Sequence, residues 1–239
     1  MQGISYIPVF LSLKDFQCLV VGGGKVALRK IEAILDAGIA VRVVSPEVGP
    51  SLERLYSGGR VKIERREFQS ADLEGVRLVI AATDDPVVNE RISTEARLRG
   101  VICNVVDQPS ISDVIMPSIV RRGRLQIAIS TGGGSPAMAR WMRVRLSRLV
   151  GVEYGMAAAI LSSLRRKALG GMDGRGSIGA LFYDLLDSGL VRLCKRGNFE
   201  EIRRLIHGLT GIEMSLAEIK ESALGGSSPR QTKSPDEAR

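Results

Sequence analysis

The sequence predicts an α/β protein with a Rossmann-like, doubly wound parallel sheet, followed by a hairpin-and-helix segment and a helical C-terminal domain. Over residues 1–112, short apolar runs alternate with stretches of helical periodicity through short connections, as in parallel sheets wound with helices. The first apolar run ends abruptly in Gly22, Gly23 and Gly24, where a helical pattern starts at once. Beyond residue 150 the periodicity is helical throughout.

The elements of the predicted sheet domain follow in order along the chain. Strands are expected at residues 16–21, 41–44, 61–63, 78–82 and 101–106. Apolar residues recur at helical spacing from Val26, and Gly38 is a natural C-cap for this first helix. Asp85 is expected to cap the next helix, with Pro86 in its first turn and Gly100 at its end.

The pattern then changes to a hairpin and helices. Strands at residues 114–120 and 125–130 are expected to pair around a turn at residues 121–124, and a second glycine cluster then opens a helix. The expected domains are a nucleotide-binding domain at 1–112, a hairpin-and-helix segment at 113–150 and a helical domain at 151–224. Glycines at 170–171 and 173–176 should break the helices, and the polar tail at 225–239 should be disordered.

Composition and charge limit the class of protein to which the chain can belong. No apolar run of the 239 residues approaches the ~20 residues of a membrane span, and the N-terminus lacks a secretory pattern, so we expect a cytoplasmic protein without a membrane partner. The three cysteines Cys18, Cys103 and Cys194 are far apart, and Cys18 and Cys103, which fall in predicted buried strands, are interpreted as small core residues rather than a disulfide or metal site. The net charge of +8 fits either a polyanionic small molecule or general solubility, and an aromatic content of 4% argues against stacked nucleic acid.

The glycine run matches the dinucleotide-binding pattern G-x-G-x-x-A through Gly22, Gly24 and Ala27. Gly22 permits the tight turn out of the strand, Gly24 lets the backbone approach a pyrophosphate, and Ala27 lets the helix pack close to the sheet. The free N–H groups of the first helical turn then face the phosphates. The alternative is a structural turn without a ligand.

The tips of two further strands would complete a nucleotide crevice. Where such folds usually place an acidic residue for the ribose, this chain has Ser45, with Pro46 next and Glu47 two positions on. Thr83 and Asp84 end the fourth strand and would line the other side, although helix capping is an alternative role for the neighbouring acidic pair.

Asp107 is the candidate for chemistry. It follows the fifth predicted strand, at the carboxyl edge of the sheet where open α/β folds bind their ligands. A carboxylate there can accept a proton, and the alternative is a turn residue before Gln108 and Pro109.

The second glycine cluster, residues 130–136, is a candidate anion site or a structural corner, because Ser135 caps a helix behind exposed backbone N–H groups. Arg140, Arg143 and Arg148 share a broad face of that helix and either steer a polyanion or form a solvated face. His207 is the single histidine and is expected on a helix surface, so no metal site is predicted.

Six segments, taken together and in order, resemble the precorrin-2 dehydrogenase family, which in many bacteria forms the N-terminal module of siroheme synthase. They are residues 22–30, 43–46, 81–85, 103–107, 115–118 and 130–136, and the resemblance runs from about Leu11 to Leu149. It implies NAD-dependent oxidation of precorrin-2, a tetrapyrrole with many carboxylate arms, to sirohydrochlorin. It also implies a homodimer in which residues 113–150 act as a dimerisation segment, and in some members insertion of Fe²⁺.

The resemblance also implies roles for particular residues. Asp107 is the catalytic residue, and it would also have to take the pyrrole protons if iron is inserted. Residues that would hold NAD are Gly22, Gly23, Gly24, Lys25, Val26, Pro46, Glu47, Ala82, Thr83 and Asp84. Residues that would hold the tetrapyrrole are Asn104, Ser130, Thr131, Gly132, Gly133 and Ser135.

A rival interpretation from another class is a nucleotide-sensing regulator that uses its basic helices to bind nucleic acid. Strongly salt-dependent affinity for duplex DNA would support it, whereas tetrapyrrole binding without a DNA shift would exclude it. We expect the dehydrogenase and no nucleic-acid partner. The resemblance favours NAD over NADP, although Ser45 in place of an acidic residue weakens that preference.

Overall fold

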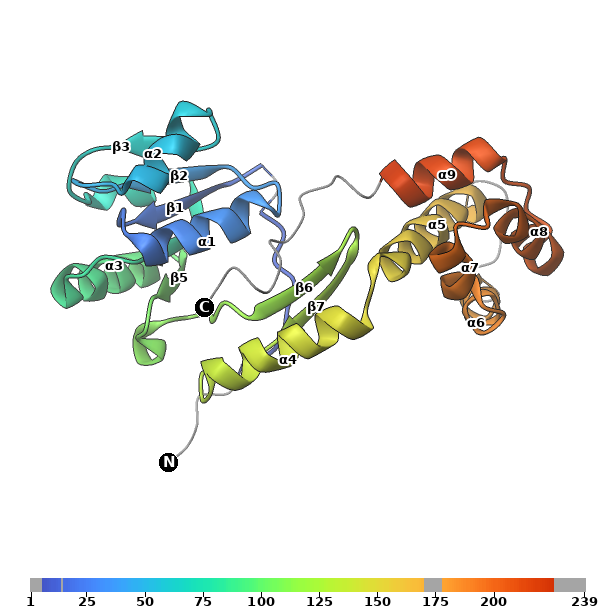
Figure 1. Cartoon of the computed structure of the whole chain (residues 1–239). Helices are drawn as coiled ribbons and strands as arrows, with labels where there is room; N and C mark the ends of the chain where they lie inside the picture. The colour runs from blue at the N-terminus through green and yellow to red at the C-terminus, as the bar shows by residue number, and fades with distance from the viewer. Residues whose placement is uncertain (1–5, 14, 170–177, 226–239) are drawn as a thin grey trace. The chain divides into compact units, whose positions relative to one another are not determined.

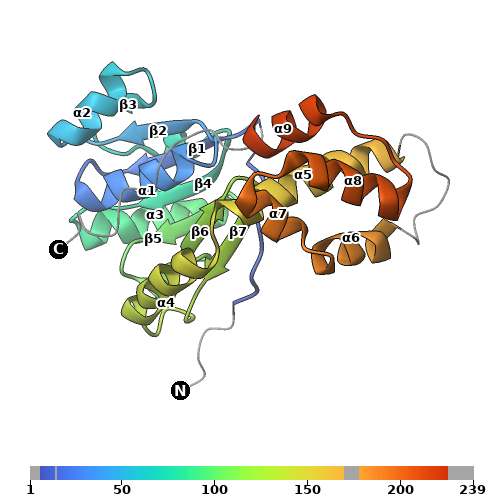
Figure 2. The same cartoon turned by 45° about the vertical axis from the view of Figure 1, so that its right-hand side comes forward.

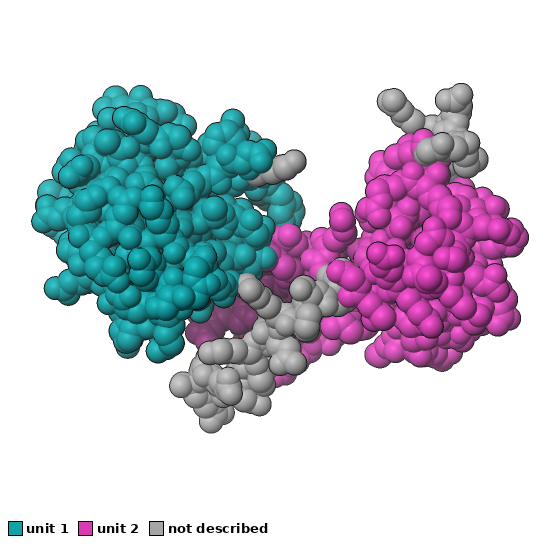
Figure 3. All heavy atoms as spheres, turned by 90° about the horizontal axis from the view of Figure 1, so that it is seen from above, with its two compact units in different colours: residues 1–116, 132–134 teal, residues 117–131, 135–239 magenta. Residues whose placement is uncertain are grey.

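The computed structural model describes residues 6–13, 15–169 and 178–225. The chain divides into two compact units, coloured separately in Figure 3. Unit 1 comprises Met1–Met116 with Gly132–Gly134, and unit 2 comprises Pro117–Thr131 with Ser135–Arg239. The glycine breaks expected at 170–171 and 173–176 lie outside the described residues, as does the expected disordered tail apart from Gly225, which ends the last helix.

Unit 1 contains a parallel sheet of five strands in the order β3-β2-β1-β4-β5. The strands are β1 (Gln17–Val21), β2 (Val41–Val44), β3 (Lys62–Glu64), β4 (Val76–Ala81) and β5 (Ile102–Val105). In the central register, Val20 pairs with Val43 on one side and with Ile80 on the other. The parallel sheet predicted from the apolar runs is therefore confirmed.

Helices lie on both faces of this sheet (Figures 1 and 2). They are α1 (Lys25–Leu35), α2 (Pro50–Ser57) and α3 (Pro86–Leu98), with short 3₁₀ turns η1 (Ser70–Leu73) and η2 (Pro109–Ile111). Ile31 of α1 and Leu52 of α2 belong to the core on one face, whereas Leu73 of η1 and Ile92 of α3 belong to the core on the other. The predicted double winding is confirmed.

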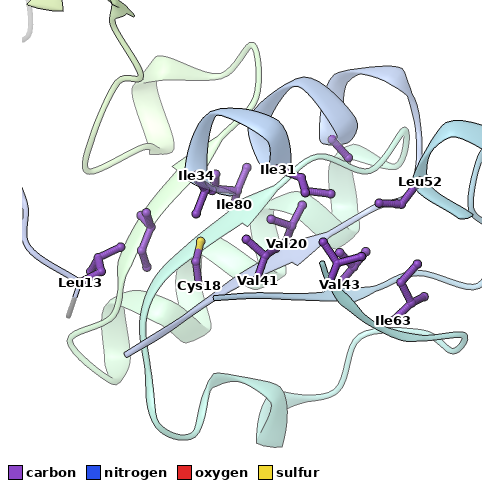
Figure 4. Packing of buried hydrophobic residues seen from close by; sticks show 13 residues of the cluster. Leu13, Cys18, Val20, Ile31, Ile34, Val41, Val43, Leu52, Ile63 and Ile80 are labelled. Carbon is purple, nitrogen blue, oxygen red and sulfur yellow. The ribbon is translucent and has the colours of Figure 1, made fainter. Parts of the chain in front are cut away.

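Successive side chains along the strands point alternately into these two cores. Val20 packs with Ile31 and Ile34 on the α1 face (Figure 4), and its neighbour Leu19 packs on the α3 face. Cys18 and Cys103 are fully buried in β1 and β5, and desolvation raises the pKa of each thiol to about 12. The interpretation of Cys18 and Cys103 as core residues is therefore confirmed, and Cys194 is also buried and free.

Helix α2 and the 3₁₀ turns were not expected from the sequence. Pro50 occupies the first turn of α2 behind an extended Gly49, which is a recognisable helix start. Leu52 is buried and Leu55 packs against the same core, but the helix has only eight residues, so its apolar stripe is short.

Unit 2 begins with an antiparallel hairpin of β6 (Ser118–Arg122) and β7 (Leu125–Ile129), followed by α4 (Pro136–Leu149). The expected bounds of the first strand (114–120) and of the turn (121–124) are wrong. Arg122 pairs with Leu125, so the turn is Gly123-Arg124, with Gly123 at φ +54°. Arg122 is a charged residue that was expected in the turn. In the structure its guanidinium instead donates to the carbonyl oxygens of Ser147 (2.7 Å) and Val150 (2.8 Å) at the C-terminal end of α4.

The rest of unit 2 is helical, as predicted. Its helices are α5 (Val152–Leu169), α6 (Ile178–Asp187), α7 (Leu190–Arg196), α8 (Phe199–Thr210) and α9 (Leu216–Gly225). Buried Ile160, Leu164 and Ile206 are among the side chains of their common core. His207 is exposed in the last turn of α8, which confirms the surface position expected for it.

A buried ion-pair network ties β2 to the segment that leads into β4. Asp72 is only 3% exposed, and its carboxylate accepts hydrogen bonds from Arg42 (3.0 Å) and Arg66 (2.8 Å). Burial raises the pKa of this carboxyl, but hydrogen bonds from Arg66, the Gln69 amide and Arg42 lower it to about 2.

We expect Asp72→Asn to lower the free energy of unfolding by about 3 kcal/mol at neutral pH, because two guanidinium groups lose their buried partner. A lowered folded-state pKa means that this stability is fully present above the unfolded value of ~3.9 and is lost as pH falls toward 2. Urea unfolding from pH 7 to pH 3 measures it, with exposed Glu74→Gln as the control. An equal deficit at pH 3 and pH 7 would show that the charge of Asp72 is not the cause.

Candidate active site at the carboxyl end of the sheet

The glycine turn after β1 is enclosed by the loops after β2 and β4. Gly22 has φ +119°, and a Cβ there would overlap the carbonyl oxygen of Ala82. A Cβ at Gly23 would overlap the carbonyl oxygen of Glu47, and the Gly23 carbonyl accepts a hydrogen bond from the Gly49 amide (3.0 Å). Only glycine fits at these two positions, because backbone atoms fill the space of a side chain.

Gly24 differs from its neighbours. It is the extended N-cap of α1, and no atom lies within 4 Å of the place that a Cβ would take. The N–H groups of the first turn have no partner inside the helix, the cap supplies no side-chain hydrogen bond, and the turn contains no acidic residue. Lys25 and Val26 in that turn are exposed. This open helix start has the geometry and the partial positive charge that bind a phosphate group.

The loop after β2 places one carboxylate near the glycine turn. Ser45, at the position where an acidic residue was sought, is buried, and its hydroxyl donates to the carbonyl oxygen of Glu47 (2.5 Å). The side chains of Pro46 and Glu47 are exposed. Ser45 therefore shapes the loop, and Glu47 is the acidic group at this strand tip.

The turn after β4 is held by a residue that sequence reasoning missed. Asn89 of α3 is buried, and its amide oxygen accepts from the Thr83 hydroxyl (2.8 Å) while its amide nitrogen donates to the Thr83 carbonyl (3.0 Å). Asp85 caps α3 by accepting from the Val87 amide (2.8 Å), as expected. Asp84 is exposed, so its carboxylate faces outward from a rigid turn.

Asp107 lies in a tightly held turn after β5. Its φ of +61° is in the left-handed region, which Asp and Asn tolerate better than most residues with a side chain. The Val106 amide donates to the Ala81 carbonyl (2.9 Å), and the Ser112 hydroxyl accepts from the Val105 amide (2.8 Å) and lies 3.0 Å from the Gln108 carbonyl. The carboxylate is exposed, so the backbone is fixed while the side chain remains open to a ligand.

Asn104 lies on β5, three residues before Asp107. It is 5% exposed, and its side-chain nitrogen donates to the Val114 carbonyl (2.8 Å). Its side-chain oxygen is buried and has no hydrogen-bond partner among the described residues. A buried acceptor without a donor is costly, which makes this atom a candidate for contact with a group from outside the chain.

The second glycine cluster divides between the units. Gly132–Gly134 belong to unit 1, and Gly133 at φ +86° lies beside Pro109, 3.8 Å from where its Cβ would be. Ser135 belongs to unit 2, where its amide donates to the Thr131 hydroxyl (2.9 Å) and its own hydroxyl accepts from the Met138 amide. Ser130 is exposed in the same unit.

Backbone hydrogen bonds join most of the expected site. The Gly22 amide donates to Val44 (3.0 Å), and the Ala82 amide donates to Val21 (2.8 Å). The loops after β1, β2, β4 and β5 thereby meet at one edge of the sheet, where open α/β folds bind ligands.

Lys30 is a further charged residue near this edge. It is half-buried on α1, although its neighbour Arg29 is exposed. Burial and the charge of Arg29 lower the pKa of Lys30, whereas the carboxylate of Asp107 raises it.

Neither a metal site nor a membrane helix is found in the described part of the chain. No group of three or more His, Cys, Asp and Glu side chains there could hold a metal ion. No helix among the described residues is long and apolar enough to cross a membrane.

Comparisons with known proteins agree with the fold. A family model described as putative NAD(P)-binding matches residues 9–118, and one described as sirohaem biosynthesis protein central matches residues 122–149. The chain is 36% identical to a siroheme synthase of Methylococcus capsulatus over 203 residues, which is 85% of this chain and 43% of that protein. It is 45% identical to a siroheme synthase of Methylobacillus flagellatus over 159 residues, 66% of this chain and 34% of the relative.

The chain thus spans less than half the length of these curated relatives. Among solved structures it is similar to SirC, a precorrin-2 dehydrogenase, with a TM-score of 0.66 and 26% identity. That match covers 83% of this chain and 100% of the solved chain. The architecture of sheet, hairpin and helices is therefore shared with this solved chain.

Proposed function

Because the chain belongs to the siroheme synthase family, as its N-terminal SirC-like module, we propose that it catalyses the NAD-dependent oxidation of precorrin-2 to sirohydrochlorin. The observation that carries this proposal is the carboxylate of Asp107, presented from a rigid left-handed turn at the sheet edge that also holds the open helix start at Gly24. A nucleotide cradle and a proton acceptor at one edge are the two requirements of a dehydrogenase.

The residues present fit a dinucleotide. The space at Gly24 and the N–H groups of Lys25 and Val26 suit the pyrophosphate, with Gly22 and Gly23 fixing the turn. Exposed Glu47 suits the ribose hydroxyls and disfavours a 2′-phosphate by charge repulsion, which supports NAD rather than NADP. The remaining proposed contacts to NAD are Pro46, Ala82, Thr83 and Asp84.

The chemistry divides between the cofactor and Asp107. The bound nicotinamide supplies the acceptor for a hydride, that is, for one proton and two electrons. Oxidation of precorrin-2 removes two hydrogen atoms, so one further proton must leave the macrocycle. Asp107 accepts that proton, and its fixed backbone keeps the carboxylate in place while it does so.

The proposed contacts to the tetrapyrrole are Asn104 and residues of the second glycine cluster. Asn104 offers its unsatisfied oxygen to a donor of the macrocycle. Gly132 and Gly133, at positive φ, carry no side chain that would keep carboxylate arms away from their backbone, and Ser130, Thr131 and Ser135 supply hydroxyl groups in the same stretch of sequence.

The direct test is an anaerobic assay with enzymatically generated precorrin-2. With NAD, the absorbance of sirohydrochlorin and that of the reduced nicotinamide should rise together in equal amounts, and NADP should give a much lower kcat/KM. A gel shift with duplex DNA at low salt serves as the control for the regulator interpretation. DNA binding with no oxidation of precorrin-2 would overturn the proposal.

We also propose that the protein is a homodimer through its hairpin and α4. In this segment only Val120 and Ala139 are buried, whereas Trp141 is 50% and Leu149 71% exposed. A two-stranded hairpin is marginally stable by itself, and exposed apolar side chains on a helix favour association. A second copy of the chain would cover the apolar side chains of α4.

Light scattering at micromolar concentration should therefore give the dimer mass, and Trp141→Glu should give the monomer. Exposed Tyr183 on α6 provides the matched control, because Tyr183→Glu adds the same charge at an aromatic position outside this segment. A wild-type monomer, or a Trp141→Glu dimer, would contradict the proposed interface.

A further inference from the structure

The outer amides of β5 are bound by side chains rather than by another strand. β5 is an edge strand in the sheet order β3-β2-β1-β4-β5, and its residues Cys103 and Val105 are buried. A buried backbone N–H group needs an acceptor. The Cys103 amide donates to the carboxylate of Asp113 (2.9 Å), and the Val105 amide donates to the hydroxyl of Ser112 (2.8 Å). Both acceptors follow the turn that contains Asp107, so the chain returns past the strand it has just left.

The Ser112 hydroxyl also bridges the two ends of that turn. Its oxygen lies 3.0 Å from the Val105 carbonyl oxygen and 3.0 Å from the Gln108 carbonyl oxygen. Val105 and Gln108 are the first and last residues of the four-residue turn, and the direct bond between them, from the Gln108 amide to the Val105 carbonyl, is 3.4 Å. A hydroxyl has one proton, so it donates to one carbonyl at a time while it accepts from the Val105 amide.

Asp107 is the third residue of this turn, and its backbone needs such support. Its φ of +61° lies in the left-handed region, where glycine or asparagine is the usual residue at this position of a turn. A residue with a side chain keeps this conformation only where the surrounding structure fixes it. The contacts of the Ser112 hydroxyl, at 2.8 and 3.0 Å, are shorter than the 3.4 Å bond of the turn itself. Because the backbone sets the direction of the Cα–Cβ bond, the same contacts fix the direction in which the carboxylate leaves the turn.

We propose that Ser112 is a positioning residue for the oxidation, whose hydroxyl holds the Asp107 backbone in the left-handed conformation that directs the carboxylate to the substrate. This inference rests on the proposed function, in which Asp107 accepts a proton. It assigns Ser112 a role that requires no contact with the tetrapyrrole or with NAD.

A second serine holds the same loop at a different place. Ser93 of α3 is 3% exposed, and its hydroxyl donates to the Ile111 carbonyl (2.6 Å). This bond ties η2 to α3, one residue before Ser112. Ser93 therefore anchors the loop as a whole, whereas the Ser112 hydroxyl contacts the end residues of the Asp107 turn. Loss of the Ser93 hydroxyl is a matched control for loss of the Ser112 hydroxyl.

The test compares Ser112→Ala with Ser93→Ala, since each variant removes one hydroxyl that is bonded to the backbone of this region. For each we would measure kcat and KM for precorrin-2, NAD affinity by calorimetry and the thermal unfolding midpoint. Should Ser112→Ala fail to fold, Ser112→Cys takes its place, because a thiol has a similar size and forms only weak hydrogen bonds.

We expect Ser112→Ala to lower kcat about tenfold, while KM for precorrin-2 and NAD affinity stay within about twofold of the wild type. A misdirected proton acceptor slows the chemical step without removing a binding contact. Ser93→Ala should keep kcat within about threefold of the wild type. Both variants should lower the unfolding midpoint by about 3 °C, because each loses a hydrogen bond of the folded state.

A double-mutant cycle with Asp107→Asn separates positioning from general damage. If Ser112 acts through Asp107, Ser112→Ala should lower kcat no further once the carboxylate is gone. The unfolding midpoint should still fall by the same amount, because the bonds of the hydroxyl are lost in either background. A purely structural role would instead lower kcat by the same factor in both backgrounds.

Four results would overturn the inference: an unchanged kcat in Ser112→Ala, a loss in KM or NAD affinity alone, an equal loss of kcat in Ser93→Ala, or an equal loss of kcat in the Asp107→Asn background. Failure of the wild-type protein to oxidise precorrin-2 would instead overturn the proposed function.

Discussion

Gly24→Val should lower NAD affinity by at least about tenfold, or ~1.4 kcal/mol of binding free energy, while the protein stays folded. A Cβ at this position meets no protein atom within 4 Å. The space it fills is the one through which a pyrophosphate would approach the N-terminus of α1. Calorimetric titration with NAD measures the effect, and circular dichroism confirms the fold.

Substitution of Gly22 should have a different effect. Gly22→Val should unfold or strongly destabilise unit 1, because its φ of +119° and the Ala82 carbonyl exclude a side chain. The two substitutions therefore separate the structural glycine from the one that faces the ligand. Unchanged NAD binding in a folded Gly24→Val protein would mean that the glycine run is only a turn.

The sheet of unit 1 could be predicted because its signal is local. Val79 and Ile80 belong to a run that is apolar at successive positions, which occurs where a parallel strand is covered on both faces. The hairpin register could not be predicted in the same way. Arg122 stays in the ladder because its guanidinium reaches the far end of α4, a contact that spans 28 residues to Val150.

The candidate site shows the same division. The roles of Gly22 and Gly24 follow from a short motif, and the position of Asp107 follows from the end of a strand. Asn89 could not be recognised as a site residue, because its importance comes from its hydrogen bond with Thr83 in the turn after β4. Its sequence surroundings are those of an ordinary helix position, so only the folded chain reveals what it contacts.

The largest effect on catalysis is expected at Asp107. Asp107→Asn should lower the turnover number for precorrin-2 by ~10²-fold or more, the usual range for a lost general base. Asparagine tolerates the left-handed backbone at φ +61° about as well as aspartate does, so the turn after β5 should survive. Alanine at this position would instead combine loss of the carboxylate with backbone strain, which makes it a poorer test.

Binding and chemistry should separate in this variant. NAD affinity should be unchanged, and precorrin-2 should bind as well as before or slightly more tightly, because a negative charge beside its carboxylate arms is gone. Asp15→Asn is the matched control, since Asp15 is an exposed aspartate at φ +67° that precedes β1, at the opposite end of the sheet strands. Stopped-flow binding and steady-state turnover of both variants measure the separation. A turnover number like that of the wild type, with weakened substrate binding, would show that Asp107 holds the substrate and that another group takes the proton.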